Sequence, residues 1–308
     1  MNSQFSIFNS PFQLVQSLLP KIPHPAIILP GRDTKRRKAT TMNDGFVRAA
    51  GEIAREAGQF LKHFSDHHRL AVEHKGNDFD FVTNADRESQ RLIAERLKAA
   101  FPDHRFVGEE DGLDDAAVAD ILSGDEYCWV CDPLDGTVNY IHHLGLYAVS
   151  VGLVRRGRAV AGAIYLPEWD ELFTAQRGCG ALLNGRPVKP SSCDDLRHAF
   201  VTADMAAANV EMRGVNMDRI KRVIMAAGGL RIEGSACVCI AQTACGRQDA
   251  YWNLGLHAWD VAAGAVILEE AGCAVSTVFG DPFTFDMKDG FLCAAPGLKG
   301  AFAGLMRP

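Results

Sequence analysis

Apolar residues recur at helical spacing in two segments of the chain. Between residues 43 and 65 they fall three or four positions apart, which predicts a helix with one buried face. The same spacing from about Asp86 to Ala100 predicts a second helix. Short apolar runs follow, and they predict strands at 105–108, 127–131, 147–154, 159–166 and 172–175. Turn residues between these runs indicate antiparallel hairpins, so this part of the chain is predicted to be α+β.

The pattern changes near Pro190, beyond which strand-like and helix-like segments alternate. The predicted strands are 199–203, 230–232, 249–252, 273–278 and 291–295, and the predicted helices are 216–227, 235–246 and 258–271. Alternation of this kind is typical of an α/β arrangement. The expected organisation is therefore an α+β half over residues 43–190 and an α/β half over residues 191–308, preceded by an extension of residues 1–42.

The net charge separates the extension from the rest. The 308 residues carry a formal charge of -6, but residues 1–42 hold six cations and one acid, which leaves -11 on the remainder. An acidic body argues against a nucleic-acid partner, and no apolar stretch approaches the ~20 residues of a membrane span. We expect residues 1–42 to be a disordered basic extension and the protein to be cytoplasmic. The alternative is an organelle-targeting peptide in residues 1–41.

Acidic residues cluster at three places, each at the end of an apolar strand or the start of a helix. These clusters are Gly108-Glu109-Glu110-Asp111, Asp132-Pro133-Leu134-Asp135-Gly136-Thr137 and Trp259-Asp260.

In the second cluster, two carboxylates lie three residues apart at the end of a buried strand, where they need a cation. If Thr137 begins a helix, the amides of Gly136 and Thr137 form an anion site. Carboxylates beside an anion site suit divalent metals held between the protein and a phosphate, and oxygen ligands suit Mg²⁺. Taken alone, the six residues fit a solvated turn equally well, because Asp, Pro and Gly all favour turns.

Four segments, taken in order, resemble the inositol monophosphatase family of Mg²⁺-dependent, lithium-sensitive phosphatases. The resemblance covers roughly residues 43–305 and implies a layered αβαβα sandwich that assembles as a homodimer. The four segments are Asp80-Phe81-Val82-Thr83-Asn84-Ala85-Asp86, Gly108-Glu109-Glu110, Asp132-Pro133-Leu134-Asp135-Gly136-Thr137-Val138-Asn139-Tyr140 and Gly255-Leu256-His257-Ala258-Trp259-Asp260-Val261-Ala262-Ala263-Gly264.

The resemblance also implies two to three Mg²⁺ ions per site. The first would bind Glu109, Asp132 and the carbonyl of Leu134. The second would bind Asp132, Asp135 and Asp260, and a third, weaker ion would bind Glu109 and water. Most of these ligands lie in the 43–190 half, whereas Asp260 and the expected substrate contacts lie in the 191–308 half.

The implied mechanism is direct in-line attack on phosphorus by a metal-activated water. Thr137 and Asp86 resemble the pair that orients and activates this water, and Glu109 shares the role of base. Asp86 and Asp260 could instead only cap their helices. Glu110 and Asp111 are interpreted as solvated neighbours, and Lys75 as a surface lysine.

The implied substrate is myo-inositol monophosphate, which would be hydrolysed to inositol and phosphate. Asn253 stands where many inositol phosphatases carry Glu, and an amide donates as well as accepts hydrogen bonds, so selectivity could shift to another ester. The alternatives are histidinol phosphate, fructose 1,6-bisphosphate or 3'-phosphoadenosine phosphate, or a catalytically silent regulatory protein. The residues implied to contact the substrate are Asp135, Gly136, Thr137, Gly234, Ser235, Ala236, Asn253 and His257.

Overall fold

The two amphipathic helices predicted from the sequence form the first layer of the structure. The computed structural model describes residues 44–75, 81–205 and 210–307, so the predicted 1–42 extension and Asp80 lie outside the described residues. Helix α2 (Asp44–His67) and helix α3 (Asn84–Ala100) pack against each other and cover one face of a large sheet. Their buried positions, such as Leu61 and Ile93, are the apolar ones that the periodicity indicated.

The large sheet has seven strands, and its spatial order follows the chain. Strand β3 runs parallel to β4, and every later neighbour is antiparallel, as the predicted hairpins require. Strand β4 continues to Asp135 instead of ending at 131, with a shift in register between Asp132 and Asp135. The strands are β3 (Arg105–Gly108), β4 (Cys128–Asp135), β5 (Ala148–Arg155), β6 (Arg158–Leu166), β7 (Glu171–Gln176), β8 (Ala181–Leu183) and β9 (Arg186–Pro187).

A second sheet has five strands in the order β11-β10-β12-β14-β13. Strand β10 is parallel to both of its neighbours, whereas β14 is antiparallel to β12 and β13. The strands are β10 (Phe200–Ala203), β11 (Gly229–Arg231), β12 (Ala250–Asn253), β13 (Ala274–Ser276) and β14 (Phe291–Ala294).

Helices α7 (Ala236–Ala244) and α8 (Ala258–Ala271) fill the space between the two sheets. Helix α8 approaches the large sheet closely: a Cβ atom added at Gly152 or Gly162 would lie 2.7 Å from the backbone of Ala262 or Ala263. Small residues on both elements allow this contact, which brings the first turn of α8 beside the end of β4.

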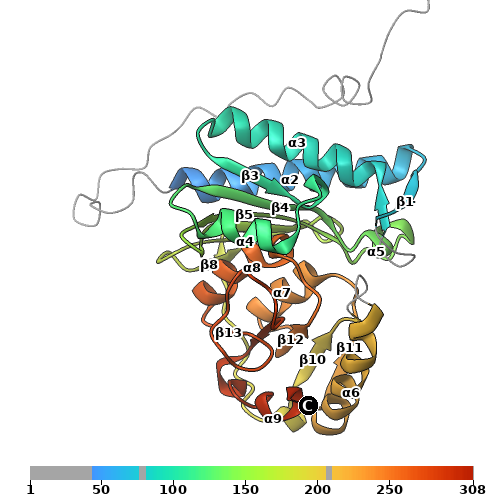
Figure 1. Ribbon diagram of the computed structural model, residues 1–308, viewed down its shortest axis with the longest axis vertical. Helices are drawn as coiled ribbons and strands as arrows, with labels where there is room; N and C mark the ends of the chain where they lie inside the picture. The colour runs from blue at the N-terminus through green and yellow to red at the C-terminus, as the bar shows by residue number, and fades with distance from the viewer. Residues whose placement is uncertain (1–43, 76–80, 206–209, 308) are drawn as a thin grey trace, which may run out of the picture. The chain divides into compact units, whose positions relative to one another are not determined.

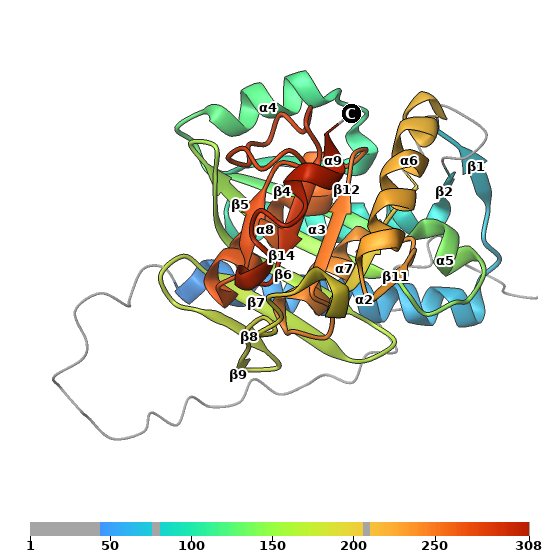
Figure 2. The same ribbon diagram turned by 90° about the horizontal axis from the view of Figure 1, so that it is seen from below.

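Helices α6 (Val210–Ala226) and α9 (Ala303–Met306) complete the structure beyond the second sheet. Figure 1 shows the resulting layers from top to bottom: α2 and α3, the seven-stranded sheet, α7 and α8, the five-stranded sheet, and then α6 and α9. Figure 2 shows α6 running alongside β11. The αβαβα architecture predicted from the sequence is therefore confirmed.

Several short elements were not predicted. Helix α4 (Asp115–Ser123) buries only Val118 and Leu122, which is too few apolar positions to reveal a period. Helix α5 (Thr137–Ile141) and the strand pair β1 (Val72–His74) and β2 (Phe81–Thr83) are likewise short. Within the described residues, none of the helices combines the length and the apolar character needed to cross a membrane.

Candidate active site

A cavity of about 400 Å³ opens beside the first turns of α7 and α8, and residues from both sheets line it. Its walls come from the end of β4 and the turn after it, from the start of α8, and from residues that follow β10 and end β12. Asp86 and Ser235 do not line the cavity, but each is hydrogen-bonded to a residue that does: Asp86 to Thr137, and Ser235 to Asp135. The sequence-predicted residues that line the cavity are Glu109, Asp132, Leu134, Asp135, Gly136, Thr137, Gly234, Ala236, Asn253, His257 and Asp260.

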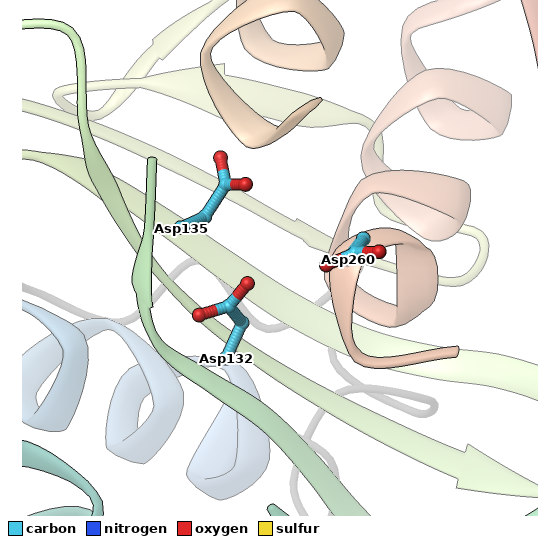
Figure 3. Close-up of side chains that lie close together, drawn as sticks. All are labelled: Asp132, Asp135 and Asp260. Atoms are coloured by element: carbon cyan, nitrogen blue, oxygen red, sulfur yellow. The ribbon is translucent and has the colours of Figure 1, made fainter. Parts of the chain in front are cut away.

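Three of these carboxylates converge. One oxygen from each of Asp132, Asp135 and Asp260 lies within 4.8 Å of the other two. Figure 3 shows Asp132 and Asp135 on the same strand segment, with Asp260 beside them on the first turn of a helix. We call these three residues the acidic cluster. Its members are up to 128 positions apart in the sequence, and the close packing of α8 on the large sheet brings them together.

The acidic cluster is electrostatically strained. Burial raises the pKa of Asp132 well above its usual range, and the charges of Glu109, Asp135 and Asp260 raise it further. Burial also raises the pKa of Asp135 to about 6 and that of Asp260 to about 7. Buried like charges of this kind are relieved by a cation. The donors are all oxygen atoms, which is the donor set that Mg²⁺ prefers, so these residues fit a divalent metal.

Asp135 is held rigidly by the start of α7. Its carboxylate accepts hydrogen bonds from the amide N–H groups of Cys237 (2.8 Å) and Ala236 (3.2 Å), and from the hydroxyl of Ser235. Ser235 and Ala236, which the sequence placed among the substrate contacts, thus bind a predicted metal ligand directly.

The turn after β4 depends on Gly136. This residue has φ +88°, and a Cβ atom here would lie 2.7 Å from the carbonyl oxygen of Leu146. Glycine adopts this conformation without a steric penalty. The turn lets Thr137 begin α5, the helix start on which the predicted anion site depended.

Thr137 and Asp86 are hydrogen-bonded in the structure. The Thr137 hydroxyl lies 3.0 Å from Asp86 Oδ1 and 3.1 Å from the carbonyl oxygen of Leu134, so its single hydrogen can go to either. Asp86 Oδ2 accepts from the backbone N–H (2.9 Å) and hydroxyl (2.5 Å) of Thr83, which caps α3. Asp86 therefore caps its helix and also binds Thr137. Burial raises the pKa of Asp86 to about 6.

Lys75 and Glu110 differ from the sequence interpretation. The Lys75 ammonium donates to Glu109 Oε1 (2.6 Å) and Glu110 Oε1 (2.5 Å), and the side chains of Lys75 and Glu110 are only 22% and 11% exposed. Glu110 is therefore not a solvated neighbour, and Lys75 is not a free surface lysine. Asp111 matches its expected exposure, although its carboxylate also binds Gln90 and the backbone N–H of Gly108.

Comparison with known proteins places this geometry in a family. The model of the inositol monophosphatase family matches residues 42–307. The chain belongs to the inositol monophosphatase family. It is 39% identical over 242 residues to inositol monophosphatase 2 of Solanum lycopersicum, covering 77% of this chain and 89% of that protein. It is 37% identical to a fructose-1,6-bisphosphatase/inositol-1-monophosphatase of Aquifex aeolicus, covering 77% and 87%.

A solved structure agrees with this assignment. Extragenic suppressor protein suhB from Bartonella henselae superposes with a TM-score of 0.75 at 30% identity, covering 84% of this chain and 97% of that one. The chain is thus a phosphatase-family protein along the whole length that carries the cavity.

His257 lines the cavity and has a partner, Asp115, that the sequence did not indicate. His257 Nδ1 lies 2.7 Å from Asp115 Oδ1 on α4, and the imidazole stacks on Trp259. Burial disfavours the charged imidazole, but the hydrogen bond to Asp115 and the nearby carboxylates raise the pKa of His257 to about 9.

Asp204 and Tyr251 are the other residues that sequence reasoning missed. Asp204 directly follows β10, lines the cavity, and accepts a hydrogen bond from the Tyr251 hydroxyl (2.9 Å). A signal was available for Asp204, because it follows an apolar strand just as Asp132 follows the run Trp129-Val130-Cys131. The sequence offered no comparable signal for Tyr251, which has the pattern of an ordinary buried aromatic residue.

Proposed function

We propose that this family member is a Mg²⁺-dependent phosphomonoesterase that hydrolyses myo-inositol monophosphate to inositol and phosphate. One observation carries the proposal: the acidic cluster and Thr137, whose hydroxyl is hydrogen-bonded to Asp86, line the same cavity. A cation-binding module alone would have no use for the second feature.

The residues that would hold the ions are the acidic cluster, Glu109 and the carbonyl group of Leu134. When bound, Mg²⁺ would neutralise charge on the phosphate and make water a better nucleophile at neutral pH. Lys75 holds Glu109 in place: burial alone would lower the lysine pKa, but the charges of Glu109 and Glu110 raise it, so the ammonium stays protonated.

Thr137 and Asp86 would handle the proton of the attacking water. When the Thr137 hydroxyl donates to Asp86 Oδ1, its oxygen lone pairs are free to accept a hydrogen from water, which orients that water. Asp86 has a pKa of about 6, so it is able to take up a proton near neutral pH. The phosphate would lie against Gly136 and Thr137, and the alcohol portion of the ester against Gly234, Asn253 and His257, which line the rest of the cavity.

A phosphate-release assay tests the proposal. The purified protein is given myo-inositol 1-phosphate, once with Mg²⁺ and once with EDTA. We expect turnover that requires Mg²⁺ and that is lost in Asp132→Asn. The control Asp125→Asn removes a carboxylate from an exposed ion pair with Arg156 outside the cavity, and should behave like the wild type. Absence of Mg²⁺-dependent hydrolysis of any phosphate monoester would contradict the proposal.

The same assay addresses the finer expectations. The Aquifex relative carries both fructose-1,6-bisphosphatase and inositol-1-monophosphatase in its name, so both esters belong in the panel. Inhibition by millimolar Li⁺ and a dimeric mass in solution are further parts of the proposal that rest on the family resemblance.

A further inference from the structure

The part of the cavity formed by the second sheet contains a carboxylate that the mechanism above does not use. Asp204 follows the last residue of β10, is buried, and lines the cavity together with Asn253. The acidic cluster and Thr137 come from the end of β4, the start of α5 and α8. A phosphate bound on those residues would direct the alcohol portion of its ester toward the second sheet, where Asp204 lies.

Asp204 belongs to a hydrogen-bond relay with a fixed direction. Asn253 Nδ2 donates to the Tyr251 hydroxyl (3.2 Å), which donates to Asp204 Oδ2 (2.9 Å). The Asn253 oxygen already accepts from the N–H of Gly255 (2.8 Å), which leaves one of its two acceptor positions. Most of the acceptor capacity for a ligand, and the only negative charge of the three side chains, therefore resides at Asp204. We call Asn253, Tyr251 and Asp204 the relay.

Asp204 retains that capacity after its own bonds are counted. Oδ1 accepts from the N–H of Gly234 (3.0 Å) and Oδ2 from Tyr251, whereas a carboxylate offers about four acceptor positions. Both donors are neutral, so Asp204 brings a negative charge to this wall when ionised. Burial raises its pKa to about 7, which is also the direction expected for a carboxylate that has no cationic partner among the residues the structure describes.

The hydrogen-bonding groups at positions 204 and 253 depend on each other through Tyr251. A glutamate at 253 could not donate to Tyr251, and the single phenolic hydrogen would then serve two competing carboxylates. An amide at 253 leaves that hydrogen to Asp204. The Asn253 that departs from many inositol phosphatases is therefore the donor that a carboxylate at 204 requires.

We propose that Asp204 is a specificity-determining residue: it selects phosphate monoesters whose alcohol portion presents a hydrogen-bond donor, a hydroxyl or an ammonium group, and rejects esters with a second phosphate at that end. This inference rests on the proposed phosphatase function and deepens it. A donor on the ester binds the free acceptor positions, whereas a second phosphate meets a like charge.

Four esters test the proposal with wild-type protein and Asp204→Asn in Mg²⁺. myo-Inositol 1-phosphate offers hydroxyls, histidinol phosphate offers an ammonium, fructose 1,6-bisphosphate carries a second phosphate, and p-nitrophenyl phosphate supplies the reference rate for each protein. Relative to this reference, kcat/KM for the inositol ester should fall about tenfold or more in Asp204→Asn, through KM. For fructose 1,6-bisphosphate, kcat/KM relative to the same reference should rise in Asp204→Asn.

The two donor-bearing esters distinguish a hydroxyl from an ammonium source. If the physiological ligand end is cationic, histidinol phosphate should be the better wild-type substrate and should lose the larger factor in Asp204→Asn. If it is a neutral polyol, the inositol ester should be the better substrate. Either result supports recognition of a donor by Asp204.

Two further variants separate recognition from a general structural effect. Tyr251→Phe removes the relay hydroxyl but keeps the carboxylate, so discrimination against the bisphosphate should persist. Asp218→Asn makes the matched charge change on the exposed surface of α6 and should leave every ratio as in the wild type. Should Asp204→Asn fail to fold, Asp204→Ser retains a neutral acceptor for Gly234 and gives the same comparison.

Unchanged ratios in a folded Asp204→Asn, or equal losses on all four esters, would overturn the proposal. Loss of discrimination against the bisphosphate in Tyr251→Phe would also overturn the proposal. Rejection of the second phosphate would then depend on the relay hydroxyl and not on the charge of Asp204. A wild-type protein inactive on all four esters would instead contradict the proposed function. In that case, calorimetric titration of the inositol ester into wild type and Asp204→Asn still decides the role of Asp204.

Discussion

The two walls of the cavity use buried carboxylates in opposite ways. At the end of β4, the acidic cluster places three carboxylates close together, and the pKa of each is raised chiefly by burial, with nearby carboxylates raising it further. At the end of β10, Asp204 stands at the end of a relay of neutral donors. The first wall needs a cation to become stable, whereas the second is complete within the protein. Function at the first wall should therefore oppose stability strongly, and function at the second should oppose it less, because hydrogen bonds from Tyr251 and Gly234 offset part of the cost of burying Asp204.

Asp132→Asn should break this contrast most strongly. We expect kcat to fall by at least about 10³-fold, because a carboxylate that would hold the metal is lost. Without metal, the same variant should be more stable, by about 1–2 kcal/mol of unfolding free energy, because one of several repelling charges is gone. The asparagine oxygen still accepts from the N–H of Leu134, which Asp132 binds at 2.9 Å.

Phosphate release and thermal unfolding in EDTA measure these two effects, with Asp125→Asn as the control. Destabilisation of Asp132→Asn in EDTA would show that the acidic cluster is already compensated within the protein, and the contrast between the walls would fail.

Thr137→Ala should lower kcat by about 10²-fold with little change in KM, because we propose that the hydroxyl orients the attacking water and does not contact the alcohol portion. Thr137→Ser keeps the hydroxyl and should recover most of the activity. Steady-state kinetics with myo-inositol 1-phosphate provide the measurement.

Thr83→Ala is the matched comparison, because Thr83 also donates to Asp86 but caps α3. It should cost about 1 kcal/mol of stability and affect kcat less than Thr137→Ala does. A larger kcat effect at Thr83 than at Thr137 would favour the capping role of Asp86 over its proposed role with water.

Mg²⁺ should stabilise the wild type in the absence of any substrate. An ion at 100 times its dissociation constant adds about 2.7 kcal/mol to the free energy of unfolding, and the acidic cluster exists only in the folded chain. Thermal unfolding across a Mg²⁺ titration should show this increase in the wild type and a much smaller one in Asp132→Asn. Equal increases in both proteins would place the ion elsewhere.

The first wall could be predicted from the sequence far better than the second. Asp132 and Asp135 belong to one short segment that ends an apolar strand, so their shared purpose is local and visible. Helices α2, α3 and α8 were predictable from their long apolar patterns, whereas the layered architecture was implied by the resemblance to the family.

The residues that escaped prediction depend on distant contacts. Lys75 resembles any surface lysine until Glu109 and Glu110 are placed against it. Tyr251 becomes the partner of Asp204 only because β10 and β12 are neighbours in the sheet. The continuation of β4 to Asp135 could not be inferred either, because Pro133 and Gly136 both indicate a turn.

The pH dependence of stability should sharpen the comparison at the second wall. The pKa of Asp204 is raised by burial from 3.8 to about 7, so between these values the folded protein holds a proton that the unfolded chain has released. Stability then falls as the pH rises from about 4 to about 7, by at most about 4 kcal/mol from this group. Asp135 and Glu233 add to the repulsion, and Tyr251 opposes it.

Asp204→Asn removes this contribution, whereas the acidic cluster contributes in the same direction in both proteins. Chemical denaturation at several pH values should therefore show the wild type losing stability relative to Asp204→Asn as the pH rises. Parallel curves would mean that Asp204 titrates near its ordinary pKa and that its neutral donors are sufficient to keep it ionised. The second wall would then carry a full negative charge at neutral pH, and its discrimination against a second phosphate should be correspondingly stronger.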